Sequence, residues 1–182
     1  DLVERALTVP SFGPIVVATN SPELSGRLTG YAGRVVVDLD EPGEAFHFGR
    51  RLLGLIARCD ADRCFYIGGG AGPLLSSADL AAIAERLLAA DRLLITNNFY
   101  SSDWAAFCPA SALAARALPN NDNELAWLLG EDAGLPIQEM PRNGATQFDV
   151  DTPADLLTLS VHPATGPHAR ACLDGMALDM QA

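Results

Sequence analysis

The chain has 182 residues, which is enough for one domain with a sizeable core and too few for two ordinary ones. Apolar residues make up 49% of the sequence, so it predicts an ordered globular domain rather than a disordered one. Twelve basic against 23 acidic residues give a net charge of −11, which repels phosphate backbones and argues against nucleic-acid binding as a main role.

Short apolar, β-branched runs bounded by turn residues predict buried strands, which in chain order are 14–18, 34–38, 64–67, 92–96 and 136–140. Helical spacing and cap residues predict helices at 1–7, after 19–23, at 49–58, 76–90, 104–118 with a break at Pro109, 124–129 and from 152 onward, with one more in the tail. This alternation predicts a single α/β domain over 1–182, built as a three-layer, mostly parallel sheet with helices on both faces.

The sequence also predicts the cellular compartment of the protein. No apolar run approaches the ~20 residues of a membrane span, and no signal peptide is visible. The four cysteines have no paired metal-ligand spacing, which favours free thiols in a reducing compartment; they are Cys59, Cys64, Cys108 and Cys172. We therefore expect a soluble cytoplasmic protein with no membrane partner.

Near the C-terminal end an extended stretch runs into a helix start. Thr152 can accept the amide of the third helical residue, Pro153 suits the first helical position, and Asp155 can complete a capping box. Asp149 precedes the cap and has no capping role, and a carboxylate at the exit of a strand lies where α/β sheets bind ligands. Asp149 is therefore a candidate binding residue, whereas Asp151 and Asp155 are better explained by helix capping.

A glycine-rich stretch, 68–72, follows the strand predicted at 64–67 and precedes a second capping box at 76–79. Its glycines permit close backbone approach to a ligand; they are Gly68, Gly69, Gly70 and Gly72. No lysine follows them, so the stretch is not a phosphate-binding P-loop, and Pro73 replaces the third glycine of a dinucleotide fingerprint.

A polar loop follows the strand predicted at 92–96. Two interpretations are open for its residues: hydrogen bonding to a substrate, or an Asx-rich turn that caps the next helix. The residues concerned are Asn97, Asn98, Tyr100 and Asp103. The run Asn121-Asp122-Asn123 is typical of an ordinary turn, and the three histidines show no triad spacing.

Two of these segments carry a family resemblance. Phe148-Asp149-Val150-Asp151-Thr152-Pro153-Ala154-Asp155-Leu156 resembles the closing motif of the nucleotidyltransferases related to the molybdenum-cofactor guanylyltransferase. Gly70-Ala71-Gly72-Pro73-Leu74-Leu75-Ser76 resembles the central metal motif of the same family, in which a strand is followed by Gly, Asp, any residue, Pro-Leu-Leu and a Ser/Thr-capped helix. The resemblance implies a Rossmann-like, glycosyltransferase-A-like nucleotidyltransferase fold.

The resemblance also implies roles for the candidate residues. Asp149 would be the catalytic residue and would hold a catalytic Mg²⁺. The backbone of Gly68, Gly69, Gly70 and Gly72 would approach the nucleotide, and Asn97, Asn98, Tyr100 and Asp103 would contact the acceptor. The partners would be a nucleoside triphosphate and a small-molecule acceptor.

The sequence departs from the family pattern in two places. Ala71 stands where the family has a metal-binding aspartate, and the family's first strand and its Gly-rich loop with Arg and Lys would lie upstream of Asp1. Two hypotheses follow. The chain is either a transferase that moves a nucleoside monophosphate to a phosphorylated or hydroxyl acceptor and releases pyrophosphate, or an inactive relative that binds a nucleotide, a sugar phosphate or a protein partner.

Overall fold

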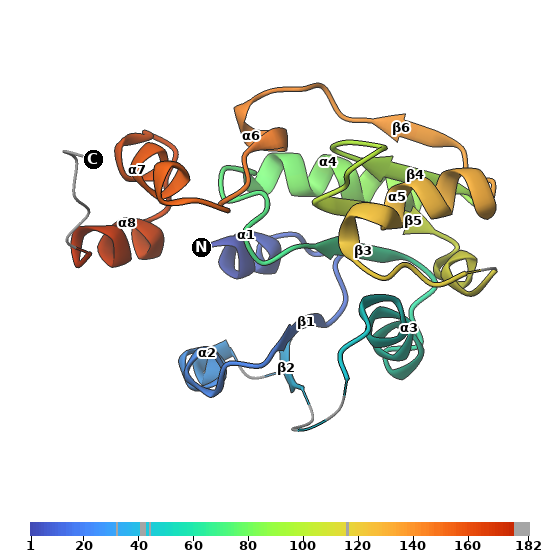
Figure 1. Ribbon diagram of the computed structural model, residues 1–182, viewed down its shortest axis with the longest axis horizontal. Coiled ribbons are helices and arrows are strands. Elements are labelled where there is room, and N and C mark those ends of the chain that lie inside the picture. The colour runs from blue at the N-terminus through green and yellow to red at the C-terminus, as the bar shows by residue number, and fades with distance from the viewer. Residues whose placement is uncertain (32, 41–42, 44, 116, 177–182) are drawn as a thin grey trace.

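The protein belongs to the mixed α/β class in a computed structural model that describes residues 1–31, 33–40, 43, 45–115 and 117–176 (Figure 1). The described strands form two sheets. In the smaller sheet β1 (Ile15–Thr19) pairs in parallel with β2 (Val35–Leu39). The larger sheet has the order β3-β5-β4-β6, with bounds Cys64–Ile67, Trp104–Cys108, Leu93–Thr96 and Ile137–Glu139.

Helices connect most of these strands. Their bounds are α1 Leu2–Leu7, α2 Pro22–Leu28, α3 Phe48–Arg58, α4 Ser77–Leu88, α5 Leu125–Trp127, α6 Gly144–Gln147, α7 Pro153–Val161 and α8 Pro167–Asp174. Both predicted capping boxes are confirmed: Ser76 and Asp79 begin α4, and Thr152 and Asp155 begin α7. Among the helices described, none has both the length and the apolar character needed to cross a bilayer.

The helix predicted over 104–118 is wrong, because its first five residues form β5. All five side chains of β5 are buried, and a short, continuously apolar run cannot be assigned to helix or strand by its periodicity. Only residues 97–103 join β4 to β5, so the chain turns back and the two strands pair antiparallel. A parallel pair would need a crossover of about a dozen residues or more.

The larger sheet is therefore mixed, whereas a mostly parallel sheet was predicted. β5 is antiparallel to both of its neighbours, β3 and β4, whereas β6 runs parallel to β4. Because β5 lies inside the sheet, its reversal leaves β3, β4 and β6 running in one direction. The ends of β3 and β4 and the start of β5 therefore meet at one edge of the sheet.

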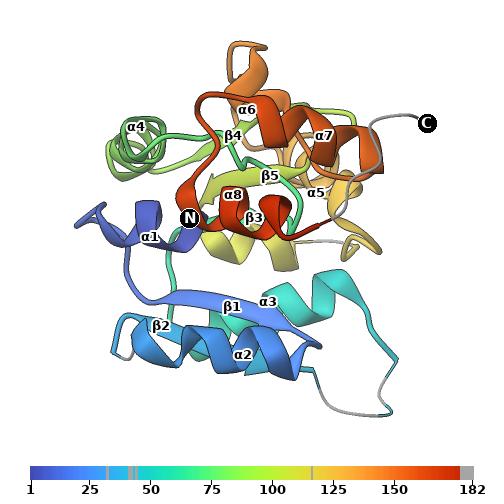
Figure 2. The same cartoon turned by 90° about the vertical axis from the view of Figure 1, so that its left-hand side faces the viewer.

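The larger sheet is covered by helices on both faces. Alternate residues of β5 point to opposite faces, as the pleat requires. Phe107 packs in an apolar cluster with Leu52 of α3 and Leu125 of α5, whereas Trp104 packs in another cluster with Ile83 of α4. Figure 2 shows α4 and α5 on opposite sides of β4.

The unit formed by β1, α2 and β2 is packed differently. Of the described residues between 10 and 47, none is buried, although the two strands are rich in valine and isoleucine. Figure 2 shows this unit as a separate layer beside α3, below the larger sheet. The main apolar core therefore belongs to the second sheet and its helices.

Candidate functional site

The two segments that carry the family resemblance meet in space. Val150 N–H donates to Gly70 O at 3.1 Å, Gly72 N–H donates to Phe148 O at 3.2 Å, and Ala71 and Asp149 form an antiparallel bridge. A Cβ atom added at Gly70 would stand 2.7 Å from Asp149 Oδ1. The absence of a side chain at Gly70 is therefore what lets the Asp149 carboxylate lie against the glycine stretch.

The Asp149 carboxyl lies in an electrostatically unfavourable place for an anion. Burial raises its pKa, the charge of Asp151 raises it further, and Asp103 and Asp122 add smaller effects in the same direction. The Val150 N–H, which donates to Asp149 Oδ1 at 3.0 Å, opposes this shift but does not cancel it. The charged form of Asp149 is thus one that a cation would stabilise.

Asn97 fixes Asp103 at the same sheet edge. Asn97 is 1% exposed, its Nδ2 donates to Asp103 Oδ2 at 2.6 Å, and its Oδ1 accepts from the backbone N–H of Asp103 at 3.1 Å. Asp103 O in turn accepts from Gly68 N–H at 2.9 Å. Burial raises the pKa of Asp103, the hydrogen bond from Asn97 lowers it, and Asp122 and Asp151 raise it, with a net upward shift. The predicted residues Gly68, Asn97 and Asp103 are therefore brought together.

Two members of this site were missed by the sequence analysis. Tyr66 Oη donates to Asp122 Oδ2 at 3.0 Å, and a Cβ atom at Gly68 would lie 3.2 Å from the same oxygen. Burial raises the pKa of the Tyr66 hydroxyl, and the charges of Asp122, Asp103 and Asp149 add to the shift. Tyr66 could have been found, because it shares a strand face with Gly68; Asp122 lies in a turn that gave no such signal.

For four predicted residues, the structure shows local turn geometry or open space around them. Asn98 Oδ1 accepts from Tyr100 N–H at 3.2 Å, which is the Asx-turn interpretation of this loop, and Tyr100 is 78% exposed beside the ring of Phe99. Gly69 is exposed with open space where a Cβ would be, and Gly72 has a φ of +62° in the turn before Leu75. Contacts of these four with an acceptor or a nucleotide stay predictions.

Ala71 packs among apolar side chains. It is 4% exposed and belongs to the apolar cluster that includes Ile83 and Trp104. A metal-binding carboxylate at this position would have to lie among apolar side chains, which is costly for a charged group. The packing thus explains why alanine suits position 71 in this chain.

Elsewhere, Asp1, Glu4 and His168 are the one group of three or more potential metal ligands within 4.8 Å among the residues the structure describes. Their polar atoms are already engaged. Asp1 accepts from the first amides of α8, at His168 N (3.1 Å) and Ala169 N (2.7 Å), and Glu4 Oε1 lies 2.7 Å from Tyr31 Oη and 2.9 Å from His168 Nε2. We interpret this group as a link between α1 and α8, which Figure 2 shows side by side.

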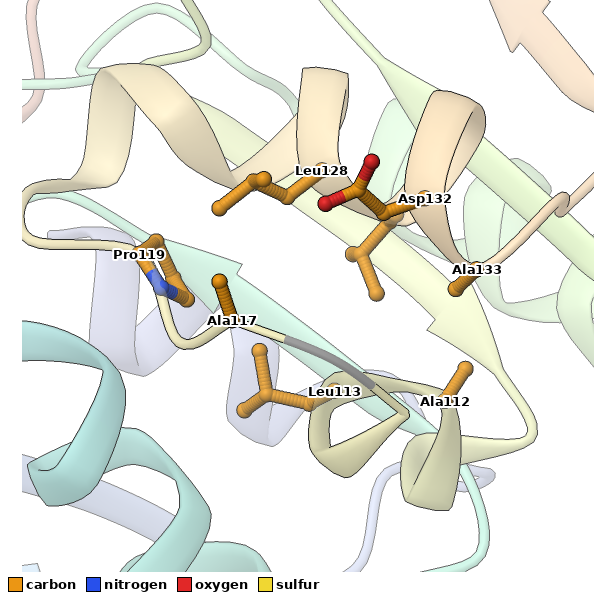
Figure 3. A pocket seen from close by; sticks show the side chains of 8 residues that line it. Ala112, Leu113, Ala117, Pro119, Leu128, Asp132 and Ala133 are labelled. Carbon is orange, nitrogen blue, oxygen red and sulfur yellow. The ribbon is translucent and has the colours of Figure 1, made fainter.

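A small crevice lies between the 3₁₀ turn Ala110–Ala114 and the π-helical turn Leu128–Asp132 (Figure 3). Leu113, Pro119 and Leu128 line it, and its volume is about 10 Å³. This is at the lower limit for one water molecule, so the crevice is a packing gap rather than a ligand site.

No protein-family model matches the sequence, and no curated protein matches it.

Proposed function

We propose that this chain is a nucleotidyltransferase-like protein with a Rossmann-like, glycosyltransferase-A-like fold. It would transfer a nucleoside monophosphate from a nucleoside triphosphate to a small phosphorylated or hydroxyl acceptor in the cytoplasm. The observation that carries the proposal is the pairing of Gly70–Gly72 with Phe148–Val150, which sets the Asp149 carboxylate against bare backbone. These are the two segments on which the family resemblance rests.

The donor atoms of the site fit Mg²⁺. Asp149 and Asp103 offer carboxylate oxygens, the hard ligands that this ion prefers, and both have pKa values raised by burial and neighbouring carboxylates. Neither Asp149 nor Asp103 belongs to a group of three or more potential ligands within 4.8 Å among the described residues, so an ion held here would keep several waters and phosphate oxygens. Bound there, Mg²⁺ would offset the charge on the triphosphate.

Residues of the chain itself would bind the nucleotide and the acceptor. The backbone at Gly69 leaves room for the nucleotide, because Gly69 is exposed and has open space where a Cβ atom would stand. An acceptor oxygen would attack the α-phosphorus, the bond from that phosphorus to the bridging oxygen would break, and pyrophosphate would leave. Asn98 and Tyr100, in the turn after β4, would contact the acceptor.

The second candidate is an inactive relative that binds a nucleotide, a sugar phosphate or a protein partner. The burial of Ala71 in an apolar cluster favours it, because that position contributes no metal ligand here. An inactive relative that binds a nucleotide shares nucleotide binding with the first candidate, but only the first candidate predicts turnover.

The test is thermal unfolding of the protein with ATP, GTP, CTP or UTP, with and without Mg²⁺, followed by an assay for pyrophosphate release. At a ligand concentration of ~100 dissociation constants the stabilisation should be about 2.7 kcal/mol. Asp149→Ala should abolish the Mg²⁺-dependent part, whereas Asp91→Ala, which removes an exposed carboxylate elsewhere, should leave it unchanged.

The outcomes separate the two candidates. Mg²⁺-dependent stabilisation with pyrophosphate release supports the transferase, and stabilisation without release supports the inactive relative. If none of the four nucleotides stabilises the protein, the transferase proposal is overturned.

A further inference from the structure

A second hollow lies away from the Asp149 site, where β2 meets α3. Its volume is about 450 Å³, which falls in the ~300–1,000 Å³ range of small-molecule sites. It lies where β2 ends, between Asp38–Asp40 on one side and α3 on the other, with Phe46 at its margin. Strand ends are the usual binding edge of α/β sheets.

Helix α3 presents a regular pattern to this hollow. Arg50, Gly54 and Arg58 follow one another at four-residue spacing, so they lie on one face of the helix. Gly54 has nothing within 4 Å of the place where its Cβ would be. The helix therefore carries two arginines on one face, with Gly54 between them in sequence and open space where its Cβ atom would stand, which leaves room for a small anion.

The third arginine holds the helix to the strand. Arg51 Nε donates to Asp40 Oδ1 at 3.1 Å, Arg51 Nη2 donates to Asp38 O at 3.1 Å, and Arg51 also pairs with the Asp38 carboxylate. Arg58 Nη2 lies 2.5 Å from Asp38 Oδ2, so one carboxylate is shared between two guanidinium groups. Burial alone would raise the pKa of Asp38, but Arg58 and Arg51 outweigh it and lower that pKa.

The ion pair with Asp38 leaves N–H donors of Arg58 available to a ligand. A guanidinium has five N–H donors, and the Asp38 pair uses only one end of Arg58, whose side chain is 58% exposed. Arg50 is exposed on the same helix face. Asp38 also holds Arg58 in place before any ligand arrives, which lowers the cost of ordering its side chain on binding.

We propose that this hollow binds the phosphate group of a small phosphorylated molecule that also carries a flat ring. Arginine pairs recognise phosphate oxygens through their planar donor fork. Phe46, at the margin, is 68% exposed and offers a ring face on which a base can stack. A nucleoside monophosphate matches both features, and the inference does not depend on the transferase proposal.

The experiment is isothermal titration of the full chain with AMP, GMP, ribose 5-phosphate and pyrophosphate, without Mg²⁺ and at two salt concentrations. The first variant, Gly54→Leu, fills the hollow while keeping every charge, and leucine is the better helix former. The second, Arg50→Gln with Arg58→Gln, removes the guanidinium pair but leaves Arg51 in place. Arg27→Gln, at an exposed pair with Glu23 on α2, is the matched control for losing a surface arginine.

We expect the wild-type protein to bind AMP or GMP more tightly than ribose 5-phosphate, with affinity that falls as salt rises. Both pocket variants should bind at least about tenfold more weakly, while Arg27→Gln binds like the wild type. Phe46→Leu should remove the preference for the nucleotide over ribose 5-phosphate.

The proposal is overturned if the wild-type protein binds none of the four probes at millimolar concentration. It is equally overturned if Gly54→Leu and the double arginine variant, shown to be folded by their unfolding curves, keep wild-type affinity. Loss of binding in Asp149→Ala alone would assign the ligand to the carboxylate site instead.

Discussion

Gly70 and Asp149 are packed so closely that the glycine cannot gain a side chain without moving the carboxylate. A Cβ atom at Gly70 would stand 2.7 Å from Asp149 Oδ1 and 2.8 Å from the backbone oxygen of Val150. Gly70→Ala should therefore cost about 1–3 kcal/mol of unfolding free energy and weaken Mg²⁺-dependent nucleotide binding. Gly69→Ala, where the added methyl group meets open space, is the control and should change stability by less than about 1 kcal/mol. Equal losses in urea denaturation of the two variants would contradict this account.

Asp149→Asn should stabilise the protein at neutral pH in the absence of metal. The pKa of Asp149 is raised above its ordinary 3.8 in the folded state, so the folded protein holds this proton more tightly than the unfolded chain does. Ionisation of Asp149 therefore costs stability as pH rises through the folded pKa. The gain from Asn should be a few tenths to about 1 kcal/mol at pH 7 and should vanish below the unfolded pKa. Unfolding free energies measured from pH 3 to 8 test this, with Asp91→Asn as the control; a gain that persists at pH 3 would be against it.

Asn97→Ala should be far more damaging than Asn98→Ala. Asn97 is 1% exposed. Its amide nitrogen donates to the Asp103 carboxylate and its amide oxygen accepts from the Asp103 backbone N–H, so Asn97→Ala leaves that partly buried N–H without this acceptor. We expect a cost of about 2–3 kcal/mol for Asn97→Ala and under about 1 kcal/mol for Asn98→Ala, whose side chain makes only a local turn bond. The loss of the hydrogen bond from Asn97 should also raise the pKa of Asp103 further, which NMR titration of its carboxyl carbon would detect. Similar costs for the two variants would show that the amide of Asn97 does not organise this edge.

Asp38→Asn should destabilise the protein because Arg51 and Arg58 would lose the carboxylate they share. The expected cost is about 1–3 kcal/mol at neutral pH. The pKa of Asp38 is lowered in the folded state, so its stabilisation is present above the ordinary value of 3.8 and is lost as pH falls through the folded pKa. Asp62→Asn, at a pair with Arg63 in which Asp62 is 71% exposed, should change little. Denaturation curves of both variants at pH 7 and pH 3 test this prediction. The difference in unfolding free energy between Asp38→Asn and Asp62→Asn should be smaller at pH 3 than at pH 7.

Much of the element order can be predicted from the sequence because local rules govern it. The runs at 64–67 and 92–96 are bounded by turn residues and are strands, and the boxes begun by Ser76 and Thr152 start helices where they were expected. The segment at 104–108 could not be assigned in this way, since a strand that is buried on both faces has no polar side to give it a period.

The candidate site was predictable only in part. Asp149 and the glycine stretch could be connected through the family resemblance, but the hydrogen bond between Tyr66 and Asp122 joins a strand to a distant turn. Nothing in the local sequence encodes that contact, which arises from the packing of α3 and α5 on one face of the sheet. By contrast, the spacing of Arg50, Gly54 and Arg58 could have been noticed, since it needs only the helical period.

The unburied unit of β1, α2 and β2 has a consequence for the motions of the protein. Its parallel ladder is intact, but its side chains are all partly accessible to solvent, so opening it exposes little additional apolar surface. The amide hydrogens of Val17 and Val37 should therefore exchange with deuterium through local opening, long before those of Ala106 at the centre of the larger sheet. Because β2 also ends at the arginine hollow, a ligand bound there should slow the exchange of Val37 while leaving that of Ala106 unchanged.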